Sequence, residues 1–325
     1  MKAITYMEYG SPDVLQITEV ERPVPKDDEV VISIRAASVN ALDRHFMRGE
    51  PYLMRMVAGL RKPKVTRLGV DVAGIVETVG GNVTQFRAGD EVFGVCRGAF
   101  AEYGCASEIR FVMKPSNVSF EQAAAVPVAA VTALQGLRDK AKIQPGQRIL
   151  VNGAGGGVGT FAVQIAKVFG ADVTAVTSTR NLDMVRSIGA DHVVDYTRED
   201  FTKNGERYDV IFDLGANHPL SDLTRVLTDD GIWLLVGAVT NGGWLRPLAN
   251  LSKSLVRARF VSQKVRLVSG RVNKDDLIVL QHFLEEGKIT PAIDRCYPLR
   301  DVPEAFRYFE EGQVKGKIII TVAIS

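Results

Sequence analysis

A run of small residues between an apolar strand and a helix most limits what this chain can fold into. Residues 149–151 predict the strand, residues 153–159 are Gly-Ala-Gly-Gly-Gly-Val-Gly, and residues 158–167 predict the helix. Such a turn brings unobstructed backbone N–H groups to a helix N-terminus, where they can bind a pyrophosphate. The glycine spacing is looser than G-x-G-x-x-G, so the flanking strand and helix support the assignment. The alternative is a glycine-rich turn that binds no ligand.

The patterns on either side of this turn predict an α/β chain of two domains. Residues 1–121 hold short alternating apolar runs between turn residues, which predicts an antiparallel β domain. Strand and helix patterns then alternate over 122–265, which predicts a doubly wound parallel sheet, with its first helix over 121–140. We assign 266–325 to the first domain, so that the nucleotide-binding domain is inserted within it. A length of 325 residues is in line with two domains.

The type of dinucleotide depends on the end of the second strand, where an acid would bind the ribose 2′-hydroxyl of NAD. No acid stands between Val173 and Leu182, and the strand runs instead into Thr177-Ser178-Thr179-Arg180. Hydroxyls and a guanidinium suit a 2′-phosphate in charge and geometry. The sequence therefore favours NADPH, although Arg180 could also be an ordinary surface residue beside a helix start.

Composition excludes several classes of protein. Forty basic and 38 acidic residues give a net charge of +2, which does not favour nucleic acid as a partner. No apolar stretch approaches the ~20 residues of a membrane span. Three cysteines without close pairing are typical of a reducing compartment, and residues 1–13 resemble no targeting segment, so we expect a cytoplasmic protein.

Several motifs lie along the chain: Ser38-Val39-Asn40-Ala41-Leu42-Asp43, Gly69-Val70-Asp71-Val72-Ala73-Gly74, Gly89-Asp90-Glu91-Val92-Phe93-Gly94, residues 123–137, the glycine turn and residues 189–196. Together these motifs resemble the medium-chain dehydrogenase/reductases, and more closely their zinc-free, quinone-oxidoreductase-like branch. The resemblance implies a GroES-like catalytic domain and a Rossmann domain, with nicotinamide and substrate in the cleft between them. It also implies a homodimer.

The resemblance carries functional residues over to matching positions. It places Asn40 and Asp43 at the substrate and nicotinamide end, and Thr132 on a helix facing the nicotinamide. The residues implied in coenzyme binding are, in chain order, Gly155, Gly156, Gly157, Val158, Ser178, Arg180, Tyr196, Gly215, Gly237 and Lys315. Asn40 and Asp43 could equally cap a short helix.

His45 stands where an aromatic hydroxyl is common in this branch. A histidine there could deliver a proton after hydride transfer, or it could be an exposed bystander. Residues 50–67 combine methionines with basic residues, which suits either a mobile flap over an apolar substrate or an ordinary surface loop.

A catalytic zinc is not expected. Val70 stands where zinc-dependent relatives have a histidine, and Asn40 lies near the position of their first cysteine ligand. Without a Lewis acid an unactivated alcohol is hard to oxidise, whereas a quinone or an α,β-unsaturated carbonyl accepts hydride at carbon readily.

We therefore expect an NADPH-dependent oxidoreductase that reduces a small, apolar, electron-poor acceptor. The alternatives are a metal-free alcohol, aldehyde or enoyl-thioester oxidoreductase and a non-catalytic NADPH-binding sensor.

Overall fold

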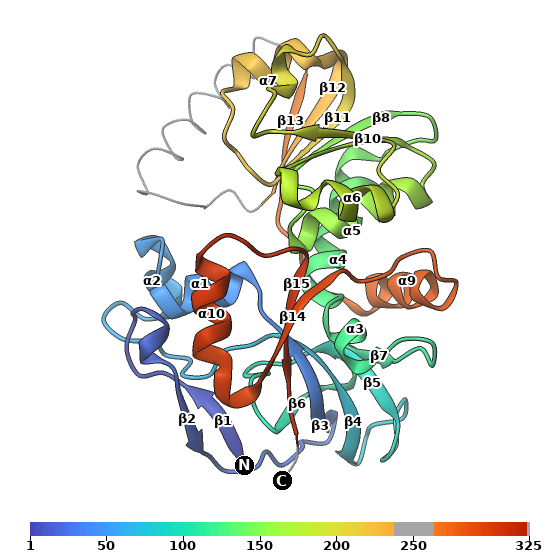
Figure 1. Cartoon of the computed structure of the whole chain (residues 1–325). Helices are drawn as coiled ribbons and strands as arrows, with labels where there is room; N and C mark the ends of the chain where they lie inside the picture. Colours follow the sequence, from blue (N-terminus) through green and yellow to red (C-terminus); the bar gives the residue numbers. More distant parts are fainter. Residues whose placement is uncertain (237–262, 324–325) are drawn as a thin grey trace. The chain divides into compact units, whose positions relative to one another are not determined.

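The computed structural model describes residues 1–236 and 263–323, without the side chains of Leu53 and Val57. The chain forms two compact units (Figure 1). Unit 1 comprises residues 1–131 and 272–325, and unit 2 comprises residues 132–271. The second unit is thus inserted in the sequence of the first. The limits predicted for the domains, 121/122 and 265/266, lie a little before these division points.

Unit 1 is built on a seven-stranded sheet with the order β14-β15-β3-β4-β5-β7, in which β6 also pairs with β3. Its strands are β3 (Glu29–Ser38), β4 (Asp71–Val79), β5 (Glu91–Val95), β6 (Tyr103–Ser107), β7 (Phe111–Met113), β14 (Ile293–Pro298) and β15 (Lys317–Thr321). The strands β1 (Lys2–Thr5) and β2 (Gln16–Glu19) form a separate hairpin pair. The predicted antiparallel pairing holds for every strand pair of unit 1 that the structure describes except β14 with β15, which is parallel.

The strand β3 is the centre of this sheet because two strands share one of its edges. Its first half, Glu29–Ser33, pairs with β6, and its last residues, Ala36–Ser38, pair with β15. The opposite edge pairs with β4 over nearly its whole length. Most residues of β3 are buried, as expected for a strand covered on both faces. The strand β3 therefore fixes the position in unit 1 of the residues that follow it, from Val39 on.

The helices of unit 1 are short. They are α1 (Ala41–Arg48), α2 (Arg55–Ala58), α3 (Phe120–Ala124), α9 (Lys274–Glu285), α10 (Val302–Glu310) and the start of α4 (Pro127–Leu134). Single turns of 3-10 helix cover residues 12–14, 52–54, 108–110 and 299–301. In Figure 1, α1 and α10 lie side by side, and Arg44 and Arg48 of α1 both pair with Glu310 of α10.

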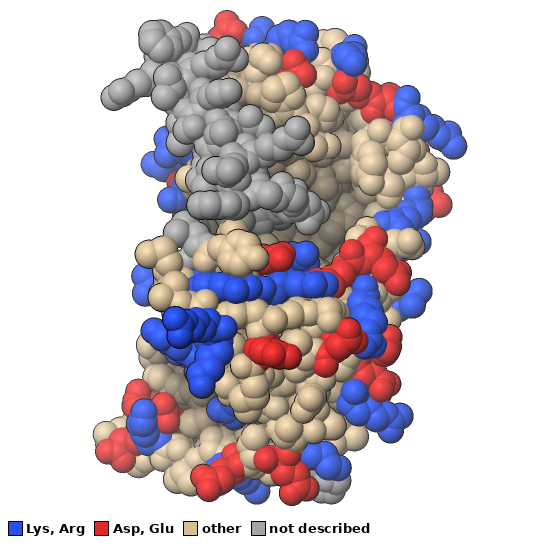
Figure 2. All heavy atoms as spheres, turned by 90° about the vertical axis from the view of Figure 1, so that its left-hand side faces the viewer, with Lys and Arg blue, Asp and Glu red and all other residues tan. Residues whose placement is uncertain are grey.

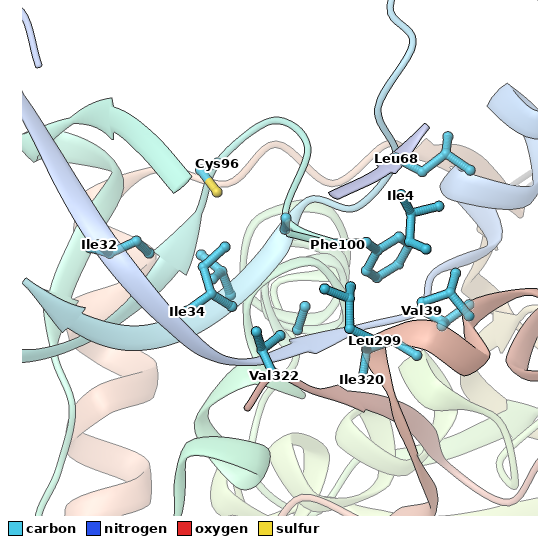
Figure 3. Packing of buried hydrophobic residues seen from close by; sticks show 14 of the residues in the cluster. Ile4, Ile32, Ile34, Val39, Leu68, Cys96, Phe100, Leu299, Ile320 and Val322 are labelled. Carbon is cyan, nitrogen blue, oxygen red and sulfur yellow. The ribbon is translucent and has the colours of Figure 1, made fainter. Parts of the chain in front are cut away.

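The core of unit 1 joins its N-terminal, central and C-terminal segments (Figure 3). Ile4, Ile34 and Ile320 come from distant parts of the sequence and are each almost completely buried. Phe100 meets Phe306 edge to face, with ring centroids 6.0 Å apart. The C-terminal residues are therefore an integral part of the first unit's core.

Unit 2 is a six-stranded, wholly parallel sheet with the order β10-β9-β8-β11-β12-β13. The strands are β8 (Arg148–Asn152), β9 (Asp172–Thr177), β10 (His192–Asp195), β11 (Tyr208–Asp213), β12 (Leu227–Val236) and β13 (Lys264–Val268). The chain moves outward from β8 to β9 and β10, and then returns to the other side of β8 at β11. Ligands of such sheets bind at this reversal, beyond the carboxyl ends of the central strands.

The helices of unit 2 are α5 (Gly157–Val168), α6 (Leu182–Ser187) and α7 (Leu220–Val226), with short 3-10 turns at 179–181 and 201–203. The segment Gln135–Ala141 forms a π-helix that continues α4. Residues 150, 176, 211, 223 and 233 are among the members of one buried apolar cluster under the sheet. The predicted combination of a GroES-like antiparallel unit and a doubly wound parallel sheet is confirmed.

No helix within 1–236 or 263–323 is both long enough and apolar enough to cross a lipid bilayer.

Candidate functional site

The glycine turn of unit 2 connects the central strand β8 to the helix α5. Gly153 has a φ of +90°, a backbone conformation that residues other than glycine rarely adopt. Gly159 lies so close to the turn that a Cβ there would be 2.2 Å from the Gly153 carbonyl oxygen. Both glycines are thus required for the strand and the helix to approach one another.

Gly156 is different, because a Cβ built on it would meet only the Gly153 oxygen, at 3.6 Å. Its φ of −89° and ψ of 174° suit any residue, and it is the N-cap of α5. No packing contact among the described residues requires a glycine at this position. The open space lies directly before the first turn of the helix, where the amides of Gly157 and Val158 have no intrahelical acceptor. A bare, positively polarised cradle of this kind suits the pyrophosphate of a dinucleotide.

The predicted 2′-phosphate residues lie on the loop after β9, which is the strand next to β8. Ser178 is half-buried, whereas Thr179 and Arg180 are exposed. The Thr179 hydroxyl donates to the Asp195 carboxylate at 2.5 Å, and this hydrogen bond helps to lower the pKa of Asp195. The sequence showed no acid near this loop, because Asp195 comes from the next strand, β10. A carboxylate from β10 is therefore hydrogen-bonded to the loop that carries Arg180.

Two further residues of this region stand out. Tyr196 follows Asp195 and is 59% exposed, so its ring is accessible to a ligand. Asn181 is buried behind the glycine turn, and its Oδ1 has no hydrogen-bond partner among the described residues. A Cβ on Gly155 would lie 2.3 Å from the Asn181 side-chain nitrogen. The 178–181 loop and the glycine turn are therefore in direct contact.

The end of β11 carries a buried carboxylate that sequence patterns did not single out. Asp213 Oδ1 accepts hydrogen bonds from Asn152 and from the backbone N–H groups of Gly215 and Ala216, and its Oδ2 accepts one from Trp233. These bonds hold the turn after β11 against the end of β8. Ala216 has a φ of +47°, which is strained for alanine. Gly215, a predicted coenzyme-binding residue, thus donates its backbone N–H to Asp213.

The remaining predicted residues of unit 2 are less informative. Thr132 is 8% exposed and packs closely against Gly270, where a Cβ would lie 2.1 Å from the threonine hydroxyl. Gly237 lies outside the described residues.

Unit 1 holds a buried polar cluster made by Ser38, Asn40, Asp71 and Lys317. The Lys317 ammonium donates to Asn40 Oδ1 at 2.6 Å and lies 3.7 Å from Asp71 Oδ2. The Asn40 amide nitrogen donates to Asp71 Oδ2 at 2.9 Å, and the Ser38 hydroxyl donates to the same oxygen. The other oxygen, Asp71 Oδ1, accepts from the Val128 amide. The Asn40 side chain is therefore held at both ends.

Asp43 lies beside this cluster at the start of α1. Its Oδ2 accepts from the Asn40 backbone N–H and its Oδ1 from the Gly69 N–H. Burial raises the pKa of Asp43 to about 7, and the neighbouring Asp71 also raises it. Burial likewise raises the pKa of Asp71 and lowers that of Lys317, whereas the attraction between these two charges opposes both shifts. Asn40 and Asp43, predicted from the sequence, are thus brought together, and Asp71 and Lys317 complete the set.

The other candidates of unit 1 are His45 and Lys315. His45 is half-buried on α1, and its Nδ1 is enclosed without a hydrogen-bond partner among the described residues. Burial lowers the pKa of His45. Lys315 has an exposed side chain, and its backbone N–H donates to Asp294.

The positions that resemble zinc ligands do not form a metal site. The Val70 side chain has no atom that can coordinate a metal. The Asn40 side chain is hydrogen-bonded to Asp71 and Lys317. Across the described part of the chain, no three His, Cys, Asp or Glu side chains are placed to hold a metal ion. Burial raises the pKa of both Cys96 and Cys105 to about 12, so neither is disposed to form a thiolate ligand.

Comparison with known proteins agrees with this architecture. A family model described as alcohol dehydrogenase GroES-like domain matches residues 26–117, and one described as zinc-binding dehydrogenase matches residues 188–320. The 2-methylene-furan-3-one reductase of Solanum lycopersicum is 37% identical, over 98% of this chain and 79% of that protein. The NADPH-dependent alkenal/one oxidoreductase, chloroplastic, of Arabidopsis thaliana is 34% identical over the same shares. The solved quinone oxidoreductase from Coxiella burnetii is 27% identical, with a TM-score of 0.87 and 99% of both chains covered.

Proposed function

The chain belongs to the medium-chain dehydrogenase/reductase family, in its quinone-oxidoreductase-like branch, and from this we infer that it is an NADPH-dependent oxidoreductase. Its substrate is an electron-poor acceptor, namely a quinone or an α,β-unsaturated carbonyl. The relatives whose names mention alkenals, enones of furan type or quinones support this class of acceptor.

The observation that carries the proposal is the open cradle at Gly156. Packing or backbone conformation accounts for the glycines at 153, 155 and 159, whereas the space in front of Gly156 and the amides of Gly157 and Val158 suit a bound ligand. Bound there, NADPH supplies the hydride. The protein's own contribution is to hold the pyrophosphate on backbone amides, with Arg180 and Ser178 at the 2′-phosphate and Tyr196 beside the adenosine half. The attraction of the Arg180 guanidinium for the 2′-phosphate must also outweigh the repulsion between that phosphate and the Asp195 carboxylate.

We propose that the reaction does not use zinc. The buried cation of unit 1 is the Lys317 ammonium, which already neutralises Asp71 and occupies the oxygen of Asn40. A quinone or enone needs less electrophilic assistance than an alcohol, because its oxygen accepts the charge as hydride arrives at carbon. Hydrogen-bond donors and a proton source are then sufficient.

Unit 1 supplies the groups on the acceptor's side. Asn40 and Asp43 keep the start of α1 in place through their hydrogen bonds to Asp71, Lys317 and Gly69. His45, one turn further along α1, is the candidate proton donor, and its unpartnered Nδ1 supports that role. Thr132, Gly215, Gly237 and Lys315 remain proposed coenzyme contacts.

Two properties of the whole protein complete the proposal. We propose a homodimer, on the resemblance to the family. We also propose a cytoplasmic location, because the chain's three cysteines are all free, as is typical of a reducing compartment. Several relatives are named as chloroplastic and another as mitochondrial, so the location is to be tested directly in cells.

The substitution Gly156→Ala tests whether the space in front of Gly156 binds the pyrophosphate. In Gly156→Ala the new Cβ has room in the protein but projects into the space assigned to the pyrophosphate. We expect an unchanged unfolding temperature and NADPH binding that is at least about tenfold weaker by calorimetry, a loss of ~1.4 kcal/mol. The matched control is Gly81→Ala, at a glycine in unit 1 whose Cβ would meet no atom within 4 Å. Equal NADPH affinity in both variants would contradict the assignment.

The preference for NADPH is tested at Arg180. Loss of a charge-assisted contact costs ~1.5–3 kcal/mol, so Arg180→Ala should weaken NADPH about 10- to 100-fold and leave NADH unchanged. Arg186→Ala, which removes an exposed guanidinium from the next helix, is the control. Consumption of NADPH on addition of quinones and enals, followed by absorbance, then tests the reaction itself.

A further inference from the structure

The segment 51–67, which contains α2, presents large apolar side chains to solvent. The exposed fractions are 62% for Tyr52, 67% for Met56, 72% for Leu60 and 42% for Val65. Single exposed apolar residues are ordinary on a protein surface, but four within fourteen positions form a local concentration. Neither the core of unit 1 nor the proposed coenzyme site explains why they are displayed.

The backbone of the segment 51–67 is tied to the body of unit 1 at several points. The Tyr9 hydroxyl donates to the Gly59 carbonyl at 2.7 Å, and the Tyr6 amide donates to the Thr66 carbonyl at 2.9 Å. The Arg55 guanidinium donates to the Gly49 carbonyl at 3.0 Å and stacks on the Tyr9 ring. The apolar side chains therefore project from an anchored loop.

The same segment is strongly basic. Arg61, Lys62, Lys64 and Arg67 are exposed, and residues 51–70 contain no Asp or Glu. In the described part of the chain, no ion pair involves Arg61, Lys62 or Lys64, whereas Arg44 and Arg48 on the neighbouring α1 are both paired with Glu310. Figure 2 shows lysine and arginine side chains on the face of unit 1 that carries α2, with Asp and Glu side chains beside them.

We propose that the segment 51–67 docks the protein on the surface of an anionic phospholipid bilayer. Apolar side chains enter the interface between headgroups and acyl chains, and the flanking basic residues are attracted to anionic lipids. The two features are needed together at such a surface. A nucleic acid would use the charges but has no place for Leu60 and Met56. The charge complementarity likewise argues against a second copy of the chain, since like charges would meet.

The proposal requires only peripheral binding. Each basic residue near an anionic membrane contributes about fivefold to the partition coefficient, and a buried leucine contributes roughly tenfold. Four basic and four apolar residues are enough for reversible binding that weakens at high salt. The proposal does not depend on the coenzyme or the acceptor, so it stands or falls separately from the proposed function.

Co-sedimentation of the full chain with vesicles tests the proposal. We expect binding to vesicles of phosphatidylcholine with phosphatidylglycerol and weak binding to phosphatidylcholine alone. The variant Lys62→Ala/Lys64→Ala should bind the anionic vesicles on the order of 20-fold more weakly, and Leu60→Ser roughly tenfold more weakly. Two matched controls should bind like the wild type: Val24→Ser, at a side chain 84% exposed elsewhere on unit 1, and Lys203→Ala, at an exposed lysine of unit 2. Equal unfolding temperatures establish that the variants are folded.

Several results would overturn the proposal. The first such result is that the wild-type protein does not bind anionic vesicles. A second is that the lysine variant loses binding whereas Leu60→Ser and Met56→Ser retain it, because a polyanion site would then suffice. A third is that Leu60→Ser changes the sedimentation mass of the protein but not its vesicle binding, which would assign the segment to a contact between copies. A fourth is that Leu60→Ser raises the KM for apolar acceptors and leaves vesicle binding unchanged, which would assign the segment to the substrate.

Discussion

Two backbone amides hold the Asp43 carboxylate in the interior of unit 1, and this burial connects the stability of the fold to pH. Because the pKa of Asp43 is raised to about 7, the folded protein binds this proton more tightly than the unfolded chain does. The stabilising contribution of the protonated acid is complete below the unfolded pKa, near 4. It is lost as the pH rises through about 7.

We therefore expect Asp43→Asn to flatten the pH dependence of stability. Between about pH 5 and about pH 8 the free energy of unfolding of the wild type should fall relative to that of the variant, by at least about 1 kcal/mol. Urea unfolding at the two pH values measures the difference. In the control Asp200→Asn the difference should stay constant, because the pKa of Asp200 is lowered to about 2 and the group is charged throughout this range. A constant difference for Asp43→Asn as well would show that Asp43 is ionised in the folded protein.

His45 gives a prediction about turnover. Since burial lowers its pKa, the imidazole is largely neutral near pH 7, and its proton-donating form accumulates only at lower pH. If it donates the proton, kcat/KM should rise as the pH falls through this pKa, and His45→Phe should lose that rise along with about 10²-fold of rate or more. A pH profile of kcat/KM, measured with the quinone below its KM and with saturating NADPH, tests this. An unaltered profile in His45→Phe would remove the residue from the mechanism.

At the residue scale, the sequence predicted the positions that lie close together along the chain. Gly153 to Gly159 and the pair Asn40 and Asp43 form local motifs that can be recognised without a structure. Lys317 could not be connected with Asn40, because 277 positions separate them and only the sheet brings them together. Asp195 and Asp213 were missed for the same reason, since each acts through partners on a neighbouring strand or on the turn that follows.

Among the elements, the last strand β15 depends on the buried pair that its first residue makes. Lys317→Met would leave Asp71 without its counter-charge and Asn40 without its donor. Removing one partner of a buried pair costs ~3–5 kcal/mol, so we expect a loss of this order in the free energy of unfolding. The control Lys315→Met, at an exposed side chain two residues earlier, should change it by less than ~0.5 kcal/mol.

A double variant makes this prediction specific. Adding Asp71→Asn to Lys317→Met should cost less than the sum of the single changes, by at least ~1 kcal/mol, because the uncompensated charge is then absent. Strict additivity would show that the two groups do not interact in solution.

The long helix predicted over 121–140 shows where element prediction failed. The residues are helical, but they divide into α3, α4 and a π-helix. Pro127 starts a new helix because its ring favours the first position and cannot donate an interior hydrogen bond. Gly136 lies so close to Phe212 that a Cβ would be 2.6 Å from the ring, and the wider π-turn falls here.

At the scale of the whole molecule, the pattern of apolar and polar residues was sufficient to predict the two kinds of unit. The alternation of strands and helices after Ile149 predicts a parallel sheet, and short alternating runs before it predict an antiparallel one. The exact limits were less accessible, because α4 runs across the division at residue 131 without a break in composition. The strand β13, with Lys264 and Arg266 in it, has an edge position that tolerates charge and therefore shows no apolar run.

Coenzyme binding should be visible in the stability of the whole protein. At about 100 times its dissociation constant, NADPH should add ~2.7 kcal/mol to the free energy of unfolding of the part that binds it. Scanning calorimetry should show a rise in the transition temperature of the wild type with NADPH, a smaller rise with NADH, and, in Gly156→Ala at the same NADPH concentration, a stabilisation reduced to about half (~1.4 kcal/mol) or less. A rise of equal size with NADPH and NADH would contradict the predicted coenzyme preference.

The position of β15 between β14 and β3 also has a consequence for synthesis on the ribosome. The N-terminal strands emerge first, but the edge of β3 at Ala36–Ser38 has no partner until Ile319–Thr321 are made, after every residue of unit 2. The described strands of unit 2 are complete by residue 268, so this unit can acquire its sheet while the first unit is still incomplete. During translation the order of maturation is therefore the reverse of the order in which the chain begins, and the N-terminal half is the part exposed longest to chaperones and proteases.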